Sequence, residues 1–387
     1  SAASGRPMRD RKRKANLTFL FLCSMRRSGP CGEGQRMKTG EKVERFIRER
    51  RLIGAGDTIL LALSGGADSV YLLLILEKLR GELSFSLYAA HVQHGIRGEE
   101  AERDLEFSRE LAERFKIPFH GIFVNVPEFS RKHHLGLEEG ARLLRYRSLR
   151  DCLSEIMDKA PERAGGRGKI AVAQHGNDQA ETVLYHLFRG SGLRGLRGME
   201  AEKDGIIRPL LPILKEEILS ELSERGIAHR EDSTNRDLSY ARNRIRGRIL
   251  PEAERLNAGA LPHILRTAEL IGEAEDLLLE RAEEIFRKEG EELLEGGELW
   301  GLRISVLSLR PLRPILRRTL LLLMSERLSP GRKDWGAVHF DALDRLLFSG
   351  NGAHLDLPEK ITADIRGKEL RLLRHSEVLS MKGRKKR

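Results

Sequence analysis

Residues Ser64 to Ser69 form a short run of glycine and hydroxyl residues of the kind that binds an anion. The run reads Ser-Gly-Gly-Ala-Asp-Ser and follows an apolar segment. Its glycines permit a positive φ and close backbone approach, its hydroxyls donate hydrogen bonds, and a helix beginning here adds N–H groups without helical partners. The run therefore predicts a phosphate-binding turn. An ordinary glycine turn with Asp68 as a helix cap is the alternative.

Paired carboxylates follow in residues 174–182, which read Gln-His-Gly-Asn-Asp-Gln-Ala-Glu-Thr. A helix that begins near Asp178 places Asp178 and Glu181 on one face, because residues three apart are neighbours on a helix. Carboxylate oxygens suit Mg²⁺ that keeps several waters and bridges to phosphates. A capping box made by the same two residues is the alternative.

Two histidines stand three residues apart in the segment His91 to Arg97, at the end of a predicted strand. From this position His91, His94 and Arg97 could reach a nucleotide. A zinc site needs further His, Cys or carboxylate ligands nearby, which this segment lacks. A structural role for each histidine stays open.

Arginines gather in two further segments. Residues 189–199 contain four glycines together with Arg189, Arg194 and Arg197, which predicts a loop rather than a stable helix. Such a loop could close over a phosphate-bearing substrate. Arg242 and Arg246 are four residues apart and so lie on one face of a predicted helix, and Arg244 stands between them in sequence. For residues 189–199 the alternative is an exposed connection. For the Arg242–Arg246 face the alternative is a solvated, charged helix.

Alternating helices and strands position these groups. The sequence predicts strands at 58–63, 84–92, 118–124 and 169–173, and helices at 42–51, 69–80, 99–115, 137–157 and 178–189. This order is typical of an α/β fold with a parallel sheet, in which active groups follow the carboxyl ends of strands. Residues 251–290, 311–327 and 335–348 predict further helices, and residues 353–374 predict short strands.

Length, net charge and cysteine content limit the classes of protein to which the chain can belong. The 387 residues predict two or three domains. The net charge of +11 comes mainly from residues 1–36 and 381–387, so bulk charge alone does not indicate nucleic-acid binding. Cys23, Cys31 and Cys152 form no metal or disulfide pattern, which fits a reducing compartment such as the cytoplasm. No apolar run is long enough for a membrane span.

Eight motifs, taken in order, resemble the tRNA(Ile)-lysidine synthetase family of pyrophosphate-loop (PP-loop) ATPases. They are SGGADS, HVQHGIR, ARLLRY, HGNDQAET, RGSGLRGLRGM, RPLL, EDSTN and RNRIR. The resemblance is continuous over residues 41–248 and weaker over residues 350–373. It implies a PP-loop domain of the adenine-nucleotide α-hydrolase type, followed by helical and small α+β C-terminal domains.

The resemblance also implies a reaction. The family uses ATP and Mg²⁺ to adenylate C2 of the wobble cytidine of a CAU-anticodon tRNA(Ile), after which L-lysine displaces AMP. ATP would then contact Ser64, Gly65, Gly66, Ala67, Asp68, Ser69, His91 and His94. Asp68, Asp178 and Glu181 would hold Mg²⁺ or the lysine amine, with Asp68 and Asp178 as the expected metal ligands. Arg145 and Arg242 would stabilise developing charge, and Arg189, Arg194, Arg197, Arg244 and Arg246 would contact the tRNA.

The sequence departs from the family pattern at Gln174 and Asn177, where the family commonly has a histidine and a carboxylate. Neither amide carries charge, so Asp178 is expected to act as the ligand. Expected boundaries are a disordered basic extension at 1–36, the catalytic domain at 37–248, a helical tRNA-contact region at 249–348, a strand-containing part at 349–381 and a basic tail. A native start near Met37 is also expected.

Two other functions and one assembly state are compatible with the motifs. A tRNA thiolase of the same loop group adenylates a base but needs reactive cysteines or an iron–sulfur site, which three scattered cysteines do not favour. A non-catalytic tRNA-binding relative would leave Asp68, Asp178 and Glu181 without a role. A homodimer is compatible with the sequence, and a membrane partner is not expected.

Overall fold

The computed structural model describes residues 38–95, 99–159, 166–230, 241–331 and 335–374. The basic extension, Arg97, the EDSTN motif and the basic tail lie outside these ranges. The chain forms two compact units that interleave along the sequence. The first comprises Ser1–His175 and Ala201–Glu231, and the second comprises Gly176–Glu200 and Asp232–Arg387. Within the described ranges, every helix is too short or too polar to cross a lipid bilayer.

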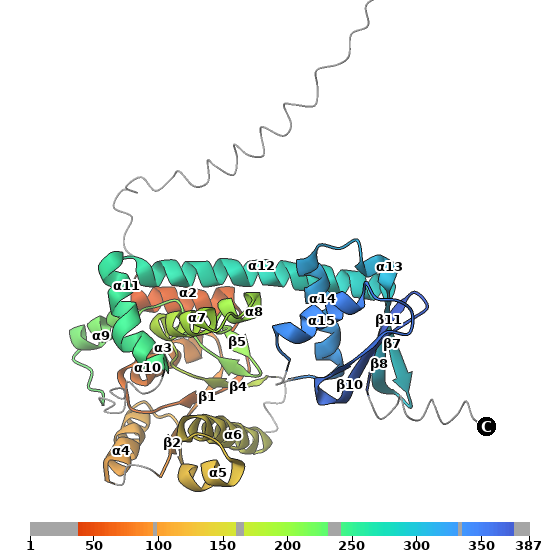
Figure 1. Cartoon of the computed structure of the whole chain (residues 1–387). Coiled ribbons are helices and arrows are strands. Elements are labelled where there is room, and N and C mark those ends of the chain that lie inside the picture. The colour runs from red at the N-terminus through yellow and green to blue at the C-terminus, as the bar shows by residue number, and fades with distance from the viewer. Residues whose placement is uncertain (1–37, 96–98, 160–165, 231–240, 332–334, 375–387) are drawn as a thin grey trace, which may run out of the picture. The chain divides into compact units, whose positions relative to one another are not determined.

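A six-stranded sheet organises the first unit, with the strand order β3-β2-β1-β4-β6-β5. Figure 1 labels β1, β2, β4 and β5 of this sheet. The strands are β1 (Thr58–Ala62), β2 (Ser86–Gln93), β3 (Phe119–Phe123), β4 (Gly168–Ala171), β5 (Glu202–Lys203) and β6 (Ile206–Ile207). β1 pairs in parallel with both β2 and β4. Only the short β5 is antiparallel, to β6. The predicted α/β fold with a parallel sheet is confirmed.

The strand order places the functional turn at the centre of this sheet. After β1 the chain passes to β2 on one side, and later returns to β4 on the other side. Connections that diverge in this way leave a crevice beyond the carboxyl ends of the two strands, where α/β proteins bind ligands. Ser64 follows β1, so the predicted phosphate turn stands at this switch point.

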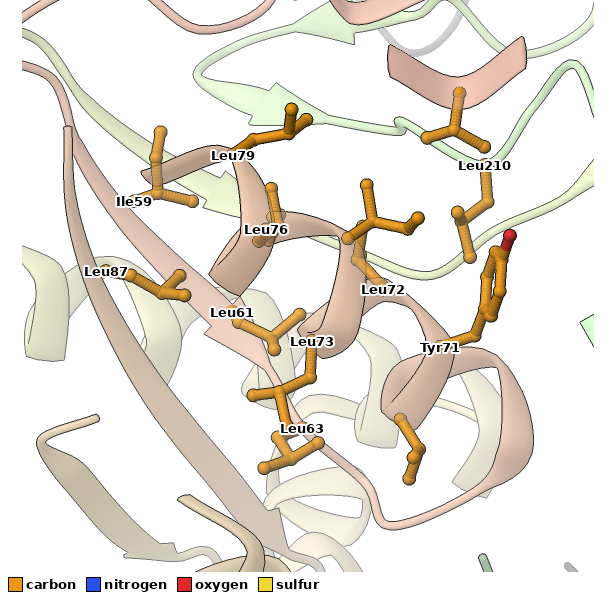
Figure 2. Close-up of a cluster of buried hydrophobic side chains, with 14 of the residues drawn as sticks. Ile59, Leu61, Leu63, Tyr71, Leu72, Leu73, Leu76, Leu79, Leu87 and Leu210 are labelled. Atoms are coloured by element: carbon orange, nitrogen blue, oxygen red, sulfur yellow. The ribbon is translucent and has the colours of Figure 1, made fainter. Parts of the chain in front are cut away.

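A buried helix anchors the turn to the sheet. The helix α3 (Ala67–Glu82) buries residues on most of its circumference, among them Tyr71, Leu72, Leu73 and Leu76. Figure 2 shows these side chains beside those of β1 and β2, and Tyr71 beside Leu210. Each fully buried leucine contributes about 1.5–3 kcal/mol through the apolar surface it removes from water. The turn is therefore fixed at both ends by core structure.

The remaining helices of the first unit are α2 (Thr39–Glu49), α4 (Glu99–Arg114), α5 (Val126–His133), α6 (Leu137–Asp158) and α9 (Lys215–Glu224). The sequence predicted all of them except α5 and α9. A separate cluster packs α6 against the sheet, with Tyr146, Leu149 and Leu153 meeting Leu60 and Ile170.

Helices make up the first part of the second unit. They are α7 (Gly176–Phe188), α8 (Leu193–Leu196), α10 (Ala241–Arg244), the π-helical turn η3 (Ile245–Ile249), α11 (Leu250–Leu256) and α12 (Ala260–Glu289). The long α12 contacts α7, α8 and α14. The helices predicted over 251–290 are confirmed, whereas α8 adds one helical turn inside the glycine-rich segment that was predicted to be a loop.

An antiparallel sheet of order β7-β8-β11-β10-β9 forms the rest of the second unit. Its strands are β7 (Gly290–Glu295), β8 (Glu298–Ser305), β9 (His354–Leu357), β10 (Ile361–Arg366) and β11 (Glu369–Arg374). The helices α13 (Val306–Leu309), α14 (Pro314–Leu328) and α15 (Ala337–Leu346) and the 3-10 turn η4 (Pro358–Lys360) complete it. The strands expected within 353–374 are present. The β7–β8 hairpin lies within residues 249–348, which were expected to be a helical region, in the stretch between the helices predicted at 251–290 and 311–327.

Candidate active site

Hydrogen bonds of the Ser69 hydroxyl fix the conformation of the predicted phosphate turn. Gly65 has a φ of +83°, which glycine adopts without strain. Ser69 Oγ donates to the Gly66 carbonyl (2.9 Å) and accepts from the Ser64 backbone N–H (3.2 Å). Gly66 is the N-cap of α3 and has no capping side chain, so Asp68 is not the helix cap. The first-turn N–H groups of α3 thus face the turn, as anion binding requires.

Asp68 lies in the first turn of α3 and is engaged by two basic side chains. Lys215 Nζ donates to Asp68 Oδ1 at 2.6 Å. His175 Nε2 lies 3.7 Å from Asp68 Oδ2. Lys215 begins α9, where a cation is unfavourable because the N-terminal end of a helix carries partial positive charge. The ion pair with Asp68 offsets that cost.

Backbone pairing braces the turn from outside the β1–α3 connection. Arg230 N–H donates to the Gly65 carbonyl at 2.9 Å, and Arg230 forms an isolated parallel bridge with Gly66. The Arg230 guanidinium donates to Asp104 Oδ1 of α4 at 2.9 Å. A Cβ on Gly65 would lie 3.2 Å from Phe107 and from Ser108, so α4 closes tightly over the turn.

His91 supports the same region from β2. Its buried Nδ1 lies 3.0 Å from the Leu63 carbonyl and 3.1 Å from Ser108 Oγ. Because Ser108 Oγ itself donates to the Asp104 carbonyl, an Nδ1–H tautomer satisfies both contacts of the ring. Burial lowers the pKa of His91, which favours the neutral ring. His94, in the segment after β2, is half-buried.

Gln174, one of the two departures from the family pattern, holds a buried arginine. Its Oε1 accepts from Arg208 Nε at 2.8 Å. A neutral amide oxygen is a good acceptor for a buried guanidinium, whereas a protonated histidine would repel it. Asn177 lies in the first turn of α7. The hydrogen bond to Arg208 therefore gives a structural explanation for glutamine at position 174, because a neutral side chain accepts from the cationic guanidinium without repelling it.

Arg145, on α6, has a buried donor without a protein acceptor. Its Nε is shielded from solvent and meets no hydrogen-bond partner within the described ranges. The guanidinium lies over the Tyr146 ring, with Cζ 5.1 Å from the ring centroid. A buried donor that no protein group satisfies is costly. An anionic substrate group would remove that cost.

In the second unit, one arginine binds both predicted carboxylates. Arg246 Nε and Nη2 donate to the two oxygens of Glu181 at 2.5 and 3.1 Å. Arg246 Nη2 also donates to Asp178 Oδ1 at 3.0 Å. Glu181 is buried, so this bidentate pair is strong. Asp178 and Glu181 share one face of α7, as predicted.

Arg242 lies over another residue of the same α7 face. Its Cζ is 5.7 Å from the ring centroid of Tyr185, four residues after Glu181. Arg242 and Arg246, also four apart, therefore both turn toward α7, although Arg246 belongs to the π-helical turn η3. Arg189 Nη1 donates to Tyr185 Oη at 2.7 Å. Arg244 lies between them and is exposed.

Hydrogen bonds and ion pairs fix the conformation of the glycine-rich segment, residues 189–199. Gln179 binds it through the carbonyls of Arg197 and Met199 and through the Met199 N–H. Arg194 forms a bidentate pair with Glu326 at 2.5 and 3.0 Å. Arg197 binds Glu275 and Asp276, both at 2.9 Å. Burial raises the pKa of Glu275. These contacts explain why this part of the chain holds a helical turn.

Each unit contributes carboxylates of the kind that suits a hard cation. Asp68 of the first unit is paired with Lys215, and Asp178 and Glu181 of the second unit are paired with Arg246. Carboxylate oxygens are ligands that Mg²⁺ prefers. Among the described residues, no three His, Cys, Asp or Glu side chains cluster as a metal site. Mg²⁺ that keeps its waters and bridges to phosphate needs only one or two carboxylates.

Sequence reasoning missed Lys215 and Arg230. Lys215 carried a detectable signal, since it is a cation at the start of a helix whose next two residues are Glu216 and Glu217. Arg230 carried none, because its role depends on backbone pairing across a long sequence separation.

Comparison with known proteins places the described geometry in context. A PP-loop domain family matches residues 37–253. A tRNA(Ile)-lysidine synthase from Dehalococcoides mccartyi is 36% identical over 84% of this chain and 68% of its own length. A tRNA(Ile)-lysidine synthase from Caldanaerobacter subterraneus is 34% identical over 85% of this chain and 68% of its own length.

Among solved structures, a U34-tRNA thiolase from Methanococcus maripaludis matches with a TM-score of 0.49. It shares 19% identity and covers 60% of this chain and 78% of that chain. A likeness of this size does not bear on function.

Proposed function

The chain belongs to the tRNA(Ile)-lysidine synthase family and carries its PP-loop domain, and we propose on this premise that it ligates lysine to a tRNA wobble base. The substrates are ATP, L-lysine and a tRNA(Ile) with a CAU anticodon. The products are a lysidine-containing tRNA, AMP and pyrophosphate. The turn of Ser64 to Ser69 carries the proposal, because its left-handed glycine and open helix start suit a nucleotide phosphate.

Adenylation is the first step of the proposed reaction. The C2 oxygen of the cytidine attacks the α-phosphorus of ATP, and pyrophosphate leaves. The PP-loop N–H groups and hydroxyls orient the phosphates, and Lys215 and Arg145 supply positive charge. No covalent intermediate with the protein is required.

Asp68 and Asp178 are the proposed Mg²⁺ ligands. Bound Mg²⁺ would neutralise phosphate charge and so favour departure of pyrophosphate. Asp68 would exchange its contact with Lys215 for the metal, and the released ammonium could turn to a phosphate. Asp178 would do the same with Arg246.

Lysine transfer is the second step. A lysine amine attacks C2 of the adenylated base, a proton leaves the amine, and AMP departs with the C2 oxygen. We propose that Glu181, the buried carboxylate of α7, attracts the substrate ammonium, while Arg242 and Arg246 stabilise the departing phosphate. Arg189, Arg194, Arg197 and Arg244 remain proposed tRNA contacts.

The thiolase alternative has no support from the cysteine that the structure describes. Cys152 is buried, and burial raises the pKa of its thiol, which disfavours the nucleophilic thiolate.

We also propose that the reaction takes place in the cytoplasm and that the protein forms a homodimer. The domain boundaries expected from the sequence are proposed as well.

Lysine incorporation tests the proposed function. Purified protein is incubated with ATP, Mg²⁺, radiolabelled lysine and an unmodified CAU-anticodon tRNA transcript. We expect one AMP and one pyrophosphate for each lysine incorporated at the wobble cytidine. A transcript with a wobble uridine is the matched control. A folded preparation that incorporates no lysine would contradict the proposal.

A further inference from the structure

A cluster of one aromatic and two cationic side chains lies at the C-terminal end of α7. The Tyr185 ring has the guanidinium carbon of Arg189 5.3 Å from its centroid and that of Arg242 5.7 Å away. His186 meets the same ring edge-on, with centroids 5.8 Å apart. We call Tyr185, His186, Arg189 and Arg242 the Tyr185 cluster. All four residues belong to the second unit.

The Tyr185 cluster differs in charge from the arginines around it. Arg194, Arg197 and Arg246 each bind carboxylates. In the part of the chain that the structure describes, neither Arg189 nor Arg242 forms such an ion pair. Burial lowers the pKa of His186, and the charges of Arg242 and Arg189 lower it further. Unlike Arg194, Arg197 and Arg246, the arginines of the Tyr185 cluster therefore carry positive charge that no carboxylate among the described residues pairs with.

An exposed aromatic residue follows Tyr185 on the same helix. Phe188 lies three residues after Tyr185 on α7, so the two are neighbours on the helix surface, and Phe188 is 61% exposed. An exposed apolar residue alone is ordinary. Here it neighbours a ring flanked by guanidinium groups, and this combination of flat apolar surface and positive charge suits a stacked nucleobase with its phosphate.

The proposed reaction creates a need for such a surface. A base whose C2 must be reached has to leave the stack of the anticodon loop, and its unpaired neighbours then lose a stacking partner. Proteins recognise single-stranded RNA loops by stacking bases on aromatic rings and on arginine planes. We propose that the Tyr185 cluster binds an unpaired base of the tRNA anticodon loop by stacking. This inference rests on the proposed function and extends it to a specific RNA contact.

The test uses the full chain and a CAU anticodon stem-loop with 2-aminopurine in place of the anticodon adenosine. Stacking quenches 2-aminopurine fluorescence, so one titration reports both the Kd and the environment of the base. The variants are Tyr185→Leu, which removes the ring, and Tyr185→Phe, which keeps it. Phe348→Leu is the matched control, because Phe348 also lies near two arginines, Arg310 and Arg317, and is 57% exposed.

Tyr185→Leu is expected to weaken stem-loop binding by roughly 5- to 150-fold and to abolish the quenching. Tyr185→Phe and Phe348→Leu should stay within about threefold of the wild type. If Tyr185→Leu does not fold, Arg189→Gln, a change at an exposed residue beside the ring, is expected to weaken binding instead. Unchanged Kd and quenching in the folded variants, with a wild type that incorporates lysine, would overturn the stacking site and leave the proposed function intact.

Two other results would also be decisive. Salt-sensitive binding without any quenching in the wild type would mean that the arginines contact only phosphates, and would overturn the inference. A wild type that binds the stem-loop but never incorporates lysine would contradict the proposed function, and this inference with it.

Discussion

The Lys215 ammonium is bound to the Asp68 carboxylate, with Nζ and Oδ1 2.6 Å apart. The pair joins the first turn of α9 to the first turn of α3, beside the phosphate turn. A carboxylate predicted to bind Mg²⁺ is thus already matched with a cation that can move to a phosphate. In the proposed reaction, the pair would couple Mg²⁺ binding at Asp68 to phosphate binding by the Lys215 ammonium.

We expect Lys215→Met to raise the KM for ATP about tenfold, equivalent to about 1.4 kcal/mol. The variant loses the ammonium that the structure places beside the PP-loop. Steady-state kinetics at saturating tRNA and lysine would measure the change. Lys78→Met on the same helix as Asp68 is the control, since Lys78 is exposed and, among the described residues, pairs with Glu44 rather than with the turn. Equal KM values for the two variants would contradict the role of Lys215.

Asp68→Ala and Asp178→Ala should each abolish adenylation and leave tRNA binding within about threefold of the wild type, because metal ligands support charge neutralisation rather than RNA affinity. Pyrophosphate release would report adenylation, and filter binding would report the tRNA complex. Glu77→Gln, at a half-buried site on α3 that is paired with Arg80, serves as the control. Normal adenylation by either alanine variant would contradict its assignment as a metal ligand.

Gly65→Ala should abolish ATP binding. An alanine at a φ of +83° costs about 1–2 kcal/mol, and its methyl would press on Phe107 and Ser108. Gly81→Ala is the matched control, because a Cβ at Gly81 meets nothing within 4 Å. That change should stabilise α3 by about 0.5–1 kcal/mol. Calorimetric ATP binding together with thermal unfolding would separate the two effects.

Sequence patterns predicted β1 to β4 of the first unit because these strands are short apolar runs bounded by turns. They missed β5 and β6, which have only two residues each and show no period. They did not predict β7, whose sequence Gly-Glu-Glu-Leu-Leu-Glu is rich in helix-forming residues. Antiparallel pairing with β8 overrides that preference. The helix α5 was missed because its eight residues are too few to show a helical period.

Those parts of the candidate site that are built from residues close together in the sequence could be predicted. The phosphate turn and the Asp178–Glu181 pair follow from spacing alone. Lys215 lies 147 residues from Asp68 and Arg246 lies 65 residues from Glu181, so only the folded chain identifies these residues as the partners of the two carboxylates. The same applies to Gln179, which binds the glycine-rich segment and thereby permits α8.

His91 should make stability depend on pH. Burial holds its pKa below the ordinary value of 6.5, so the unfolded chain takes up a proton first as the pH falls. The stability contributed by the neutral ring is complete above pH 6.5 and is lost as the pH falls through the lowered pKa. Urea unfolding at pH 7.5 and 5.5 should show a larger loss for the wild type than for His91→Gln. An equal loss in both proteins would contradict this account.

Arg197→Met should lower the free energy of unfolding by about 3 kcal/mol at neutral pH, because it leaves Glu275 buried without its partner. Burial raises the pKa of Glu275, so the penalty should shrink as the pH falls and the carboxyl becomes neutral. The double variant Arg197→Met with Glu275→Leu should recover most of the loss. Denaturant titrations at pH 7.5 and 5 would check all three expectations.

The interleaved path of the chain constrains how chimeric enzymes can be made. The chain leaves the first unit after His175, re-enters it at Ala201 and leaves again after Glu231. Joining the first 248 residues of this protein to the C-terminal part of a relative would separate Arg194 and Arg197 from Glu326 and Glu275. A functional exchange must therefore transfer residues 176–200 together with everything after residue 231, so recombination between relatives requires three crossovers rather than one.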